Sequence, residues 1–196
     1  MVAIAATLLI LPLVDEAAVY LADEKAQGHI ASAAGFLAAN GESLLAFAIS
    51  FAVIARLWVT HHLLFTPVRA LDGLLITFNM LWAFTLVFLP LPTQMTALYA
   101  NQPSTVALYV GTMLASSVLL VAIVVHVRRK PELASAEPPL AGTVATSILF
   151  ALALVLGVLT NSYLPLLLLL LGGVLTKLLR PRLDPHYAES ATAASE

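Results

Sequence analysis

The sequence contains no cysteine and few charged residues. Of its 196 residues, 10% are Asp, Glu, Lys or Arg, and the formal net charge is −2. The absence of cysteine excludes disulfides, thiolate metal sites and cysteine nucleophiles. The small net charge gives no reason to expect a nucleic-acid partner. Glycine-rich phosphate loops and the hydrolase motifs HExxH and GxSxG are also missing, so we expect no enzyme, no cofactor and no bound metal.

What the chain has instead is apolar sequence. Hydrophobic residues make up 61% of it, and the mean hydropathy is +0.97, whereas soluble domains are about half apolar and a quarter charged. Six runs approach the roughly 20 residues that a membrane-spanning helix needs. They cover residues 1–14 (with an extension toward 21), 43–64, 73–98, 104–127, 140–160 and 163–179. Because backbone groups in hydrocarbon must be paired within their own segment, we predict an all-α membrane protein with six transmembrane helices.

The basic residues predict the orientation of these helices. Eight of the nine fall on one side of a six-span arrangement, and only Lys25 falls on the other. Basic loops stay in the cytoplasm, so both termini are expected there. Residues 1–183 then form the transmembrane domain, and the small, polar residues 184–196 form a disordered cytoplasmic tail. The eight residues are Arg56, Arg69, Arg128, Arg129, Lys130, Lys177, Arg180 and Arg182.

The first apolar run repeats branched side chains at helical spacing. Ile4, Leu8 and Leu11 lie at i, i+4 and i+7 and share a face, and Thr7 falls in the same stripe. An ordinary buried helix explains the pattern if the Thr7 hydroxyl bonds a carbonyl one turn earlier. Alternatively, several copies of the helix surround an axis, where apolar rings gate by dewetting and a ring of hydroxyl oxygens contacts cations. The residues alone leave both interpretations open.

Polar side chains gather near the end of the second run, RLWVTHHLLF. Arg56, Trp58, His61 and His62 are costly in or near lipid, so they are expected to be paired or functional. They act either as interfacial anchors or as a polar network that fixes helix packing. A metal site is disfavoured because adjacent histidines point in different directions and no acidic or cysteine ligand lies at suitable spacing. In the third run, Asn79 is expected to hydrogen-bond a neighbouring helix rather than contact a substrate.

Three blocks of this sequence carry a family resemblance. VAIAATLLILPL, SFAVIARLWVTHHLLF and LLITFNMLWAFTLVFLPLPT follow in order, and their HH pair, Asn and P-x-P stand at the expected places. They resemble the transmembrane protein 175 family of potassium channels from residue 1 to about residue 100. The later runs match that family in number and length but carry weaker motifs.

The resemblance implies a six-helix bacterial homotetramer whose first helix lines the pore. By aligned position, Ile4 matches the isoleucine of the narrowest apolar ring, and Leu8 and Leu11 match the further apolar rings. Thr7 matches a polar ring linked to potassium preference. The lack of a TVGYG filter fits such a side-chain pore.

The resemblance also implies a structural polar network of Trp58, His61, His62 and Asn79. In the family, these positions are the local partners of an Arg and a Phe-Ser-Asp motif directly upstream of the first helix. This chain starts just after that motif. We therefore expect its first helix to lack its beginning, and the chain as written to be destabilised or inactive because polar groups in lipid lose their partners.

The expected function is a potassium-permeable cation channel in a bacterial inner (plasma) membrane. Its partners would be K+, the lipid bilayer and further copies of itself. Acidic residues at the outer mouth either raise the local cation concentration or form an ordinary solvated loop. These residues are Asp15, Glu16, Asp23 and Glu24.

Two other functional classes remain as alternatives. A secondary transporter of small cations or solutes would have broken helices and a midplane ionisable site, yet no Asp or Glu lies at the centre of any run. A membrane enzyme using His61 and His62 would need acidic metal ligands on the same side, and Asp72 is the only near candidate.

Overall fold

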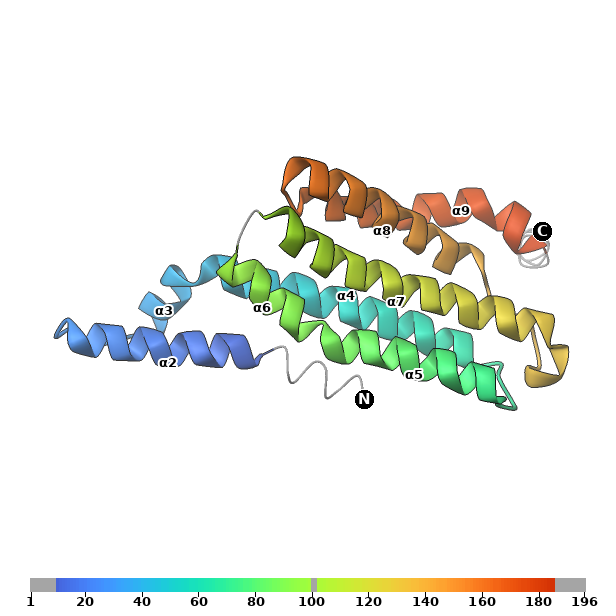
Figure 1. Ribbon diagram of the computed structural model, residues 1–196, viewed down its shortest axis with the longest axis horizontal. Helices are drawn as coiled ribbons and strands as arrows, with labels where there is room; N and C mark the ends of the chain where they lie inside the picture. The colour runs from blue at the N-terminus through green and yellow to red at the C-terminus, as the bar shows by residue number, and fades with distance from the viewer. Residues whose placement is uncertain (1–9, 100–101, 186–196) are drawn as a thin grey trace, which may run out of the picture.

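The computed structural model describes residues 10–99 and 102–185, and this part of the chain forms helices and no β-strand (Figure 1). Five helical segments are long and apolar enough to cross a membrane, which confirms the predicted all-α membrane class. The first predicted run lies mostly outside the described residues, so the six-span count and the cytoplasmic termini stay predictions. The five candidate spans are Ser43–Phe65, Gly73–Thr96, Pro103–Arg129, Ala141–Thr160 and Leu164–Leu183.

The helices follow one another with short connections. In chain order they are α2 (Leu11–Ala26), α3 (Ala33–Ala39), α4 (Gly41–Phe65), α5 (Gly73–Phe88), α6 (Pro90–Leu98), α7 (Pro103–Arg129), the 3₁₀ turn η1 (Pro131–Leu133), α8 (Ala141–Thr160), the 3₁₀ helix η2 (Leu164–Leu171) and α9 (Gly172–Leu183). Helices α4, α5, α7 and α8 run lengthwise through the molecule, and α2 and α3 extend beyond one end of this bundle (Figure 1).

Helix α7 occupies the centre of the bundle and packs against α8 and α5. Its buried residues, including Val106, Val110 and Met113, recur at helical spacing along the chain. Helix α8 buries small residues at four-residue intervals, among them Ala145 and Gly157, and such residues let helices approach closely in lipid. A Cβ atom at Gly157 would lie 3.0 Å from Val106 Cγ1, so a larger residue here would require the Val106 side chain to move.

The third predicted run is divided in two. Helix α5 ends at Phe88, where the Leu89 N–H bonds the Leu86 carbonyl in a 3₁₀ turn at 3.3 Å. Helix α6 then starts at Pro90. Proline has no N–H and its ring clashes with the preceding turn, so it begins a helix well but interrupts one. The expected span over residues 73–98 is present as Gly73–Thr96, and it is divided at Leu89 into α5 and α6.

The last span is also irregular. The expected span over residues 163–179 is present as Leu164–Leu183, but residues Leu164–Leu171 form a 3₁₀ helix and only Gly172–Leu183 is α-helical. Runs of 3₁₀ helix beyond three or four residues are uncommon. No pattern in these eight leucine-rich residues predicts the tighter winding. The change from 3₁₀ helix to α-helix occurs at the Gly172-Gly173 pair.

Two loops meet at one end of the bundle. The α4–α5 loop bonds the α7–α8 loop through Arg69 N–H to the Leu133 carbonyl and Ser135 N–H to the Pro67 carbonyl, both at 2.8 Å. Connections that we assigned to the same side from their basic residues are therefore in contact. Asp184, which we placed in the disordered tail, is buried among these helices, whereas residues 186–196 of that tail lie outside the described part.

Candidate functional site

The predicted pore-lining residues fall largely outside the described chain. Ile4, Thr7 and Leu8 are among residues 1–9, so the structure places none of them. Leu11 begins α2, and 51% of its surface is exposed. An exposed leucine at this point is available to contact lipid or another copy of the chain, and the role of the whole stripe stays a prediction.

His61 joins α4 to α5. It lies on the face of α4 that also carries the buried Ile54, Leu57 and Leu64, and its Nε2 is 2.7 Å from Asn79 Oδ1 on α5. Its ring stacks on the buried Trp82, with centroids 3.9 Å apart and planes 9° apart. His61 therefore links α4 to α5 twice, by a hydrogen bond to Asn79 and by a stacked ring contact with Trp82.

Trp58 and His62 do not reach this pair. They are one turn apart on α4, both are exposed, and their rings stack on each other with centroids 5.8 Å apart. Since consecutive residues differ by about 100° around a helix, His62 faces away from His61. The four residues that the resemblance groups together thus form two separate pairs, and their role as one structural polar network stays a prediction.

Arg56 lies within α4, nine residues before its end. Its side chain is exposed and reaches toward the start of α9, where a Cβ atom at Gly172 would be 2.7 Å from Nη2. The guanidinium can approach so closely only because residue 172 has no side chain.

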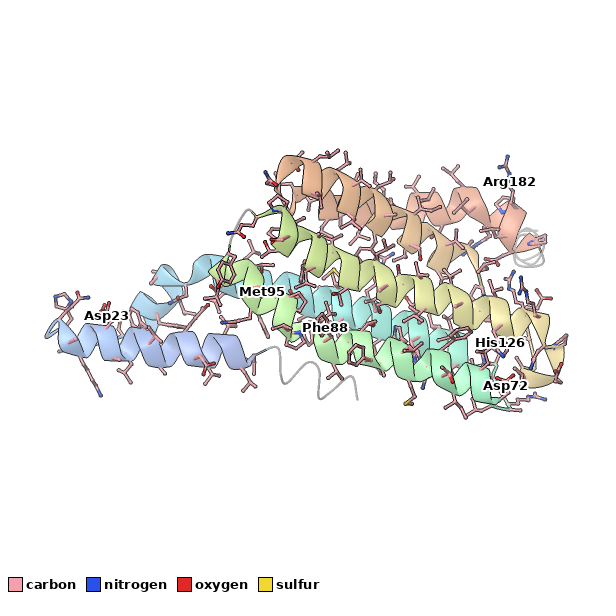
Figure 2. All side chains as sticks on the ribbon, viewed as in Figure 1. Asp23, Asp72, Phe88, Met95, His126 and Arg182 are labelled. Carbon is pink, nitrogen blue, oxygen red and sulfur yellow. The ribbon has the colours of Figure 1, made fainter. Side chains whose placement is uncertain are left out.

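A carboxylate that the sequence reasoning treated only as a possible metal ligand organises one end of the bundle. Asp72 Oδ1 accepts the Leu75 N–H at 2.8 Å and so caps α5. Its Oδ2 is 2.7 Å from Lys130 Nζ and 2.9 Å from His126 Nε2, and Figure 2 shows Asp72 and His126 close together at the end opposite Asp23. The hydrogen bond from Lys130, and then that from the Leu75 N–H, hold the pKa of Asp72 well below its usual range. The i, i+4 spacing of His126 and Lys130 places both on one face of α7 and is the signal that could have indicated this cluster.

Asp184 is the centre of a second polar cluster, on the other side of α7, which we call the Asp184 clasp. The carboxylate accepts the backbone N–H groups of Leu140 and Ala141, each at 2.9 Å, and so caps the start of α8. It also pairs with Arg128, whose guanidinium donates to the Leu183 carbonyl at 2.8 Å and to the Pro138 carbonyl at 2.9 Å. No local pattern joins residues 56 positions apart, so this clasp could not be predicted from spacing along the chain.

The acidic residues predicted at the outer mouth are dispersed along α2. Glu16 accepts a hydrogen bond from Ser43 of α4 at 3.1 Å, Asp23 bonds Gln27, and Glu24 lies 3.5 Å from His29. Within the described ranges, no three His, Cys, Asp or Glu side chains are placed to hold a metal ion.

Comparison with known proteins finds similarity over part of the chain. A family model described as "Endosomal/lysosomal potassium channel TMEM175" matches residues 1–90. A potassium channel of Streptomyces collinus is 33% identical over 120 residues, which are 59% of this chain and 58% of that protein. The rat "Endosomal/lysosomal proton channel TMEM175" is 38% identical over 103 residues, 52% of this chain and 20% of that protein. A potassium channel of Chamaesiphon minutus is 35% identical over 80 residues, 39% of each chain.

The aligned segments span at most about three fifths of these relatives' lengths. The range that the family model matches includes α4 and α5, and so the His61–Asn79 pair. The family model covers the same blocks on which the sequence resemblance rests, and the resemblance is thereby confirmed: residues 1–90 of the chain match the TMEM175 family.

Proposed function

We propose that this chain is the subunit of a potassium-permeable cation channel that assembles as a homotetramer in a bacterial inner membrane. The observation that carries the proposal is the alignment with two bacterial potassium channels and with the family model over residues 1–90. That range includes the amphipathic stripe of the first apolar run.

In the proposed pore, copies of the N-terminal helix surround the ion path. Ile4 forms the narrowest apolar ring, Leu8 and Leu11 form further rings, and Thr7 supplies hydroxyl oxygens. An ion crossing such a constriction must shed part of its hydration shell, and the threonine oxygens compensate for part of this loss. Potassium gives up water more easily than the smaller sodium ion, which accounts for a moderate potassium preference.

The charges of the spans support passive conduction. The five candidate spans contain no Asp or Glu, so none of them carries the carboxylate that a proton- or sodium-coupled carrier would use. The basic residues lie mainly at one end, where they orient the chain. The proposed role of the His61–Asn79 pair is to hold α4 against α5 behind the pore helix.

A secondary transporter is the second candidate, and one observation favours it. Two of the candidate spans are interrupted, one at Leu89 between α5 and α6 and the other at Gly172 between η2 and α9. Broken spans are typical of transporters, where they surround a substrate site near the midplane.

Flux measurements on the reconstituted chain distinguish the candidates. We expect potassium flux that exceeds sodium flux and does not require a proton gradient, at rates far above transporter turnover. Slow, saturable, proton-dependent flux would favour the transporter. Because the rat relative is named a proton channel, proton flux is measured in the same vesicles, and a current carried by protons alone would contradict the proposed ion preference.

The position of the pore is tested by Ile4→Ala with Leu9→Ala as the matched control. Widening the narrowest ring is expected to raise the potassium leak and to reduce the preference for potassium over sodium. Leu9 lies outside the stripe at 100° per residue, so its substitution should leave both quantities unchanged. Unchanged current in Ile4→Ala, or equal effects of the two substitutions, would rule out the N-terminal helix as the pore lining.

A further inference from the structure

The last span exposes a straight row of leucines. Side chains at i and i+3 eclipse one another in a 3₁₀ helix, so Leu164, Leu167 and Leu170 of η2 stand in one line. Their surfaces are 72%, 61% and 81% exposed. The unusual 3₁₀ winding therefore produces a narrow apolar track along the outside of the bundle.

Helix α9 continues this track and ends it in positive charge. Its inner face carries the buried Gly172 and the half-buried Leu175 and Thr176 toward α8, whereas Val174 and Leu178 are exposed one turn apart. Three exposed cations lie beside and after these two residues, in the last two turns of α9. These are Lys177, Arg180 and Arg182.

These three cations form no ion pair within the described residues. The aspartates at this end are engaged elsewhere, because Asp72 faces Lys130 and His126 while Asp184 faces Arg128. The Asp184 clasp fixes the end of α9 to α7 and α8, and Figure 2 shows Arg182 at the outer edge of the molecule. The positive charge is thus held in place and directed away from the protein.

We propose that the flank formed by the exposed residues of η2 and α9 binds an anionic phospholipid. The acyl chain lies along the leucine row and the Val174–Leu178 turn, and the phosphodiester head group is held by the three cations. The track from Leu164 to Leu178 is about 25 Å long at 2.0 Å per residue in η2 and 1.5 Å in α9. This exceeds the roughly 15 Å of one hydrocarbon leaflet, so the apolar part is long enough to accommodate a chain whose head group reaches the cations.

The test titrates the detergent-solubilised chain with phosphatidylglycerol or phosphatidylcholine and derives the apparent affinity from the rise in unfolding temperature. The wild-type chain should bind phosphatidylglycerol more tightly than phosphatidylcholine. Removing two cations in K177Q/R180Q should weaken phosphatidylglycerol binding about 25-fold, at about fivefold per basic residue. Binding of phosphatidylcholine should not change.

The matched control is R69Q/R129Q, which removes two exposed cations at the same end of the bundle but outside α9. This variant should keep the wild-type preference. An undiminished preference in K177Q/R180Q, or an equal loss in the control, would overturn the proposal in favour of a general charge effect. Raising salt to about 1 M shortens the Debye length to about 3 Å and should remove the preference from the wild-type chain, a result that does not depend on the folding of a variant.

Discussion

Removing the Asp184 carboxylate is expected to destabilise the bundle more than any surface substitution. Asp184 is 4% exposed, and it holds three groups together: the Leu140 and Ala141 N–H donors of α8 and the guanidinium of Arg128 on α7. In Asp184→Ala, both N–H groups lose their cap and the guanidinium loses its counter-charge.

The magnitude follows from these separate losses. Loss of a helix N-cap costs about 1 kcal/mol, and leaving one member of a buried ion pair without its partner costs about 3–5 kcal/mol. Arg128 keeps its bonds to the Pro138 and Leu183 carbonyls, which places the ion-pair loss at the lower end of that range. We therefore expect the free energy of unfolding to fall by about 4 kcal/mol.

Unfolding in mixed micelles with increasing denaturing detergent measures this change. Asp23→Ala is the control, because Asp23 is exposed and bonds only the exposed Gln27 among the described residues, and such sites usually change stability by less than about 0.5 kcal/mol. The double variant R128M/D184L removes both charges together, so its loss should be smaller than the sum of the two single losses. A value for Asp184→Ala within about 0.5 kcal/mol of wild type would refute the reasoning, because the clasp would then contribute nothing beyond a surface contact.

Three further changes test other parts of the fold by the same unfolding measurement. Asn79→Leu leaves His61 without its partner, so stability should fall by about 1–3 kcal/mol, and no change would mean that the 2.7 Å contact contributes nothing. The folded-state pKa of Asp72 is depressed, so the ionised carboxylate stabilises the fold above the ordinary carboxylate pKa, and this stabilisation is lost as the pH falls through the lower folded value. On acidification below about pH 4, wild type should therefore lose more stability than Asp72→Asn does. Parallel pH profiles would contradict this. Gly157→Ala should destabilise by about 1–3 kcal/mol because its Cβ would meet both the Ser162 carbonyl oxygen and Val106 Cγ1 of α7 at 3.0 Å. The matched Gly111→Ala, with open space around it, should be neutral or stabilising by about 1 kcal/mol; equal effects would show that the α7–α8 contact is not tight.

Span positions were the most predictable property of this chain. The expected runs over residues 43–64, 104–127 and 140–160 agree with α4, α7 and α8 to within a few residues at each end, because apolar composition over about 20 residues is itself the physical requirement for spanning. Composition does not determine the winding within a span. Eight residues rich in leucine satisfy hydrocarbon equally well as α-helix or 3₁₀ helix, which is why the geometry of η2 was missed.

The polar contacts were predictable only where they are local or where one residue has few alternatives. An Asn inside an apolar span needs a partner on a neighbouring helix, and the structure places His61 beside Asn79. Trp58 and His62 were grouped with this pair through the resemblance, but helix geometry directs them to another face. The partners of Asp184 depend on how α7, α8 and α9 are arranged in space, and no spacing along the chain encodes that arrangement.

The two carboxylate clusters join some helices of the bundle by charged contacts and leave others without them. Residues 126 and 130 share one face of α7, and residue 128 lies about 200° around the helix from residue 126. The last turns of α7 therefore bind α5 through Asp72 and bind α8 and α9 through Asp184. In contrast, α4 is joined to the other spans of the described chain by two side-chain hydrogen bonds, Ser50–Tyr109 and His61–Asn79, both at 2.7 Å. Hydrogen bonds between uncharged groups contribute about 1 kcal/mol each, less than bonds to charged groups. It follows that polar side-chain contacts hold α4 to the bundle less strongly than they hold α5, α8 and α9.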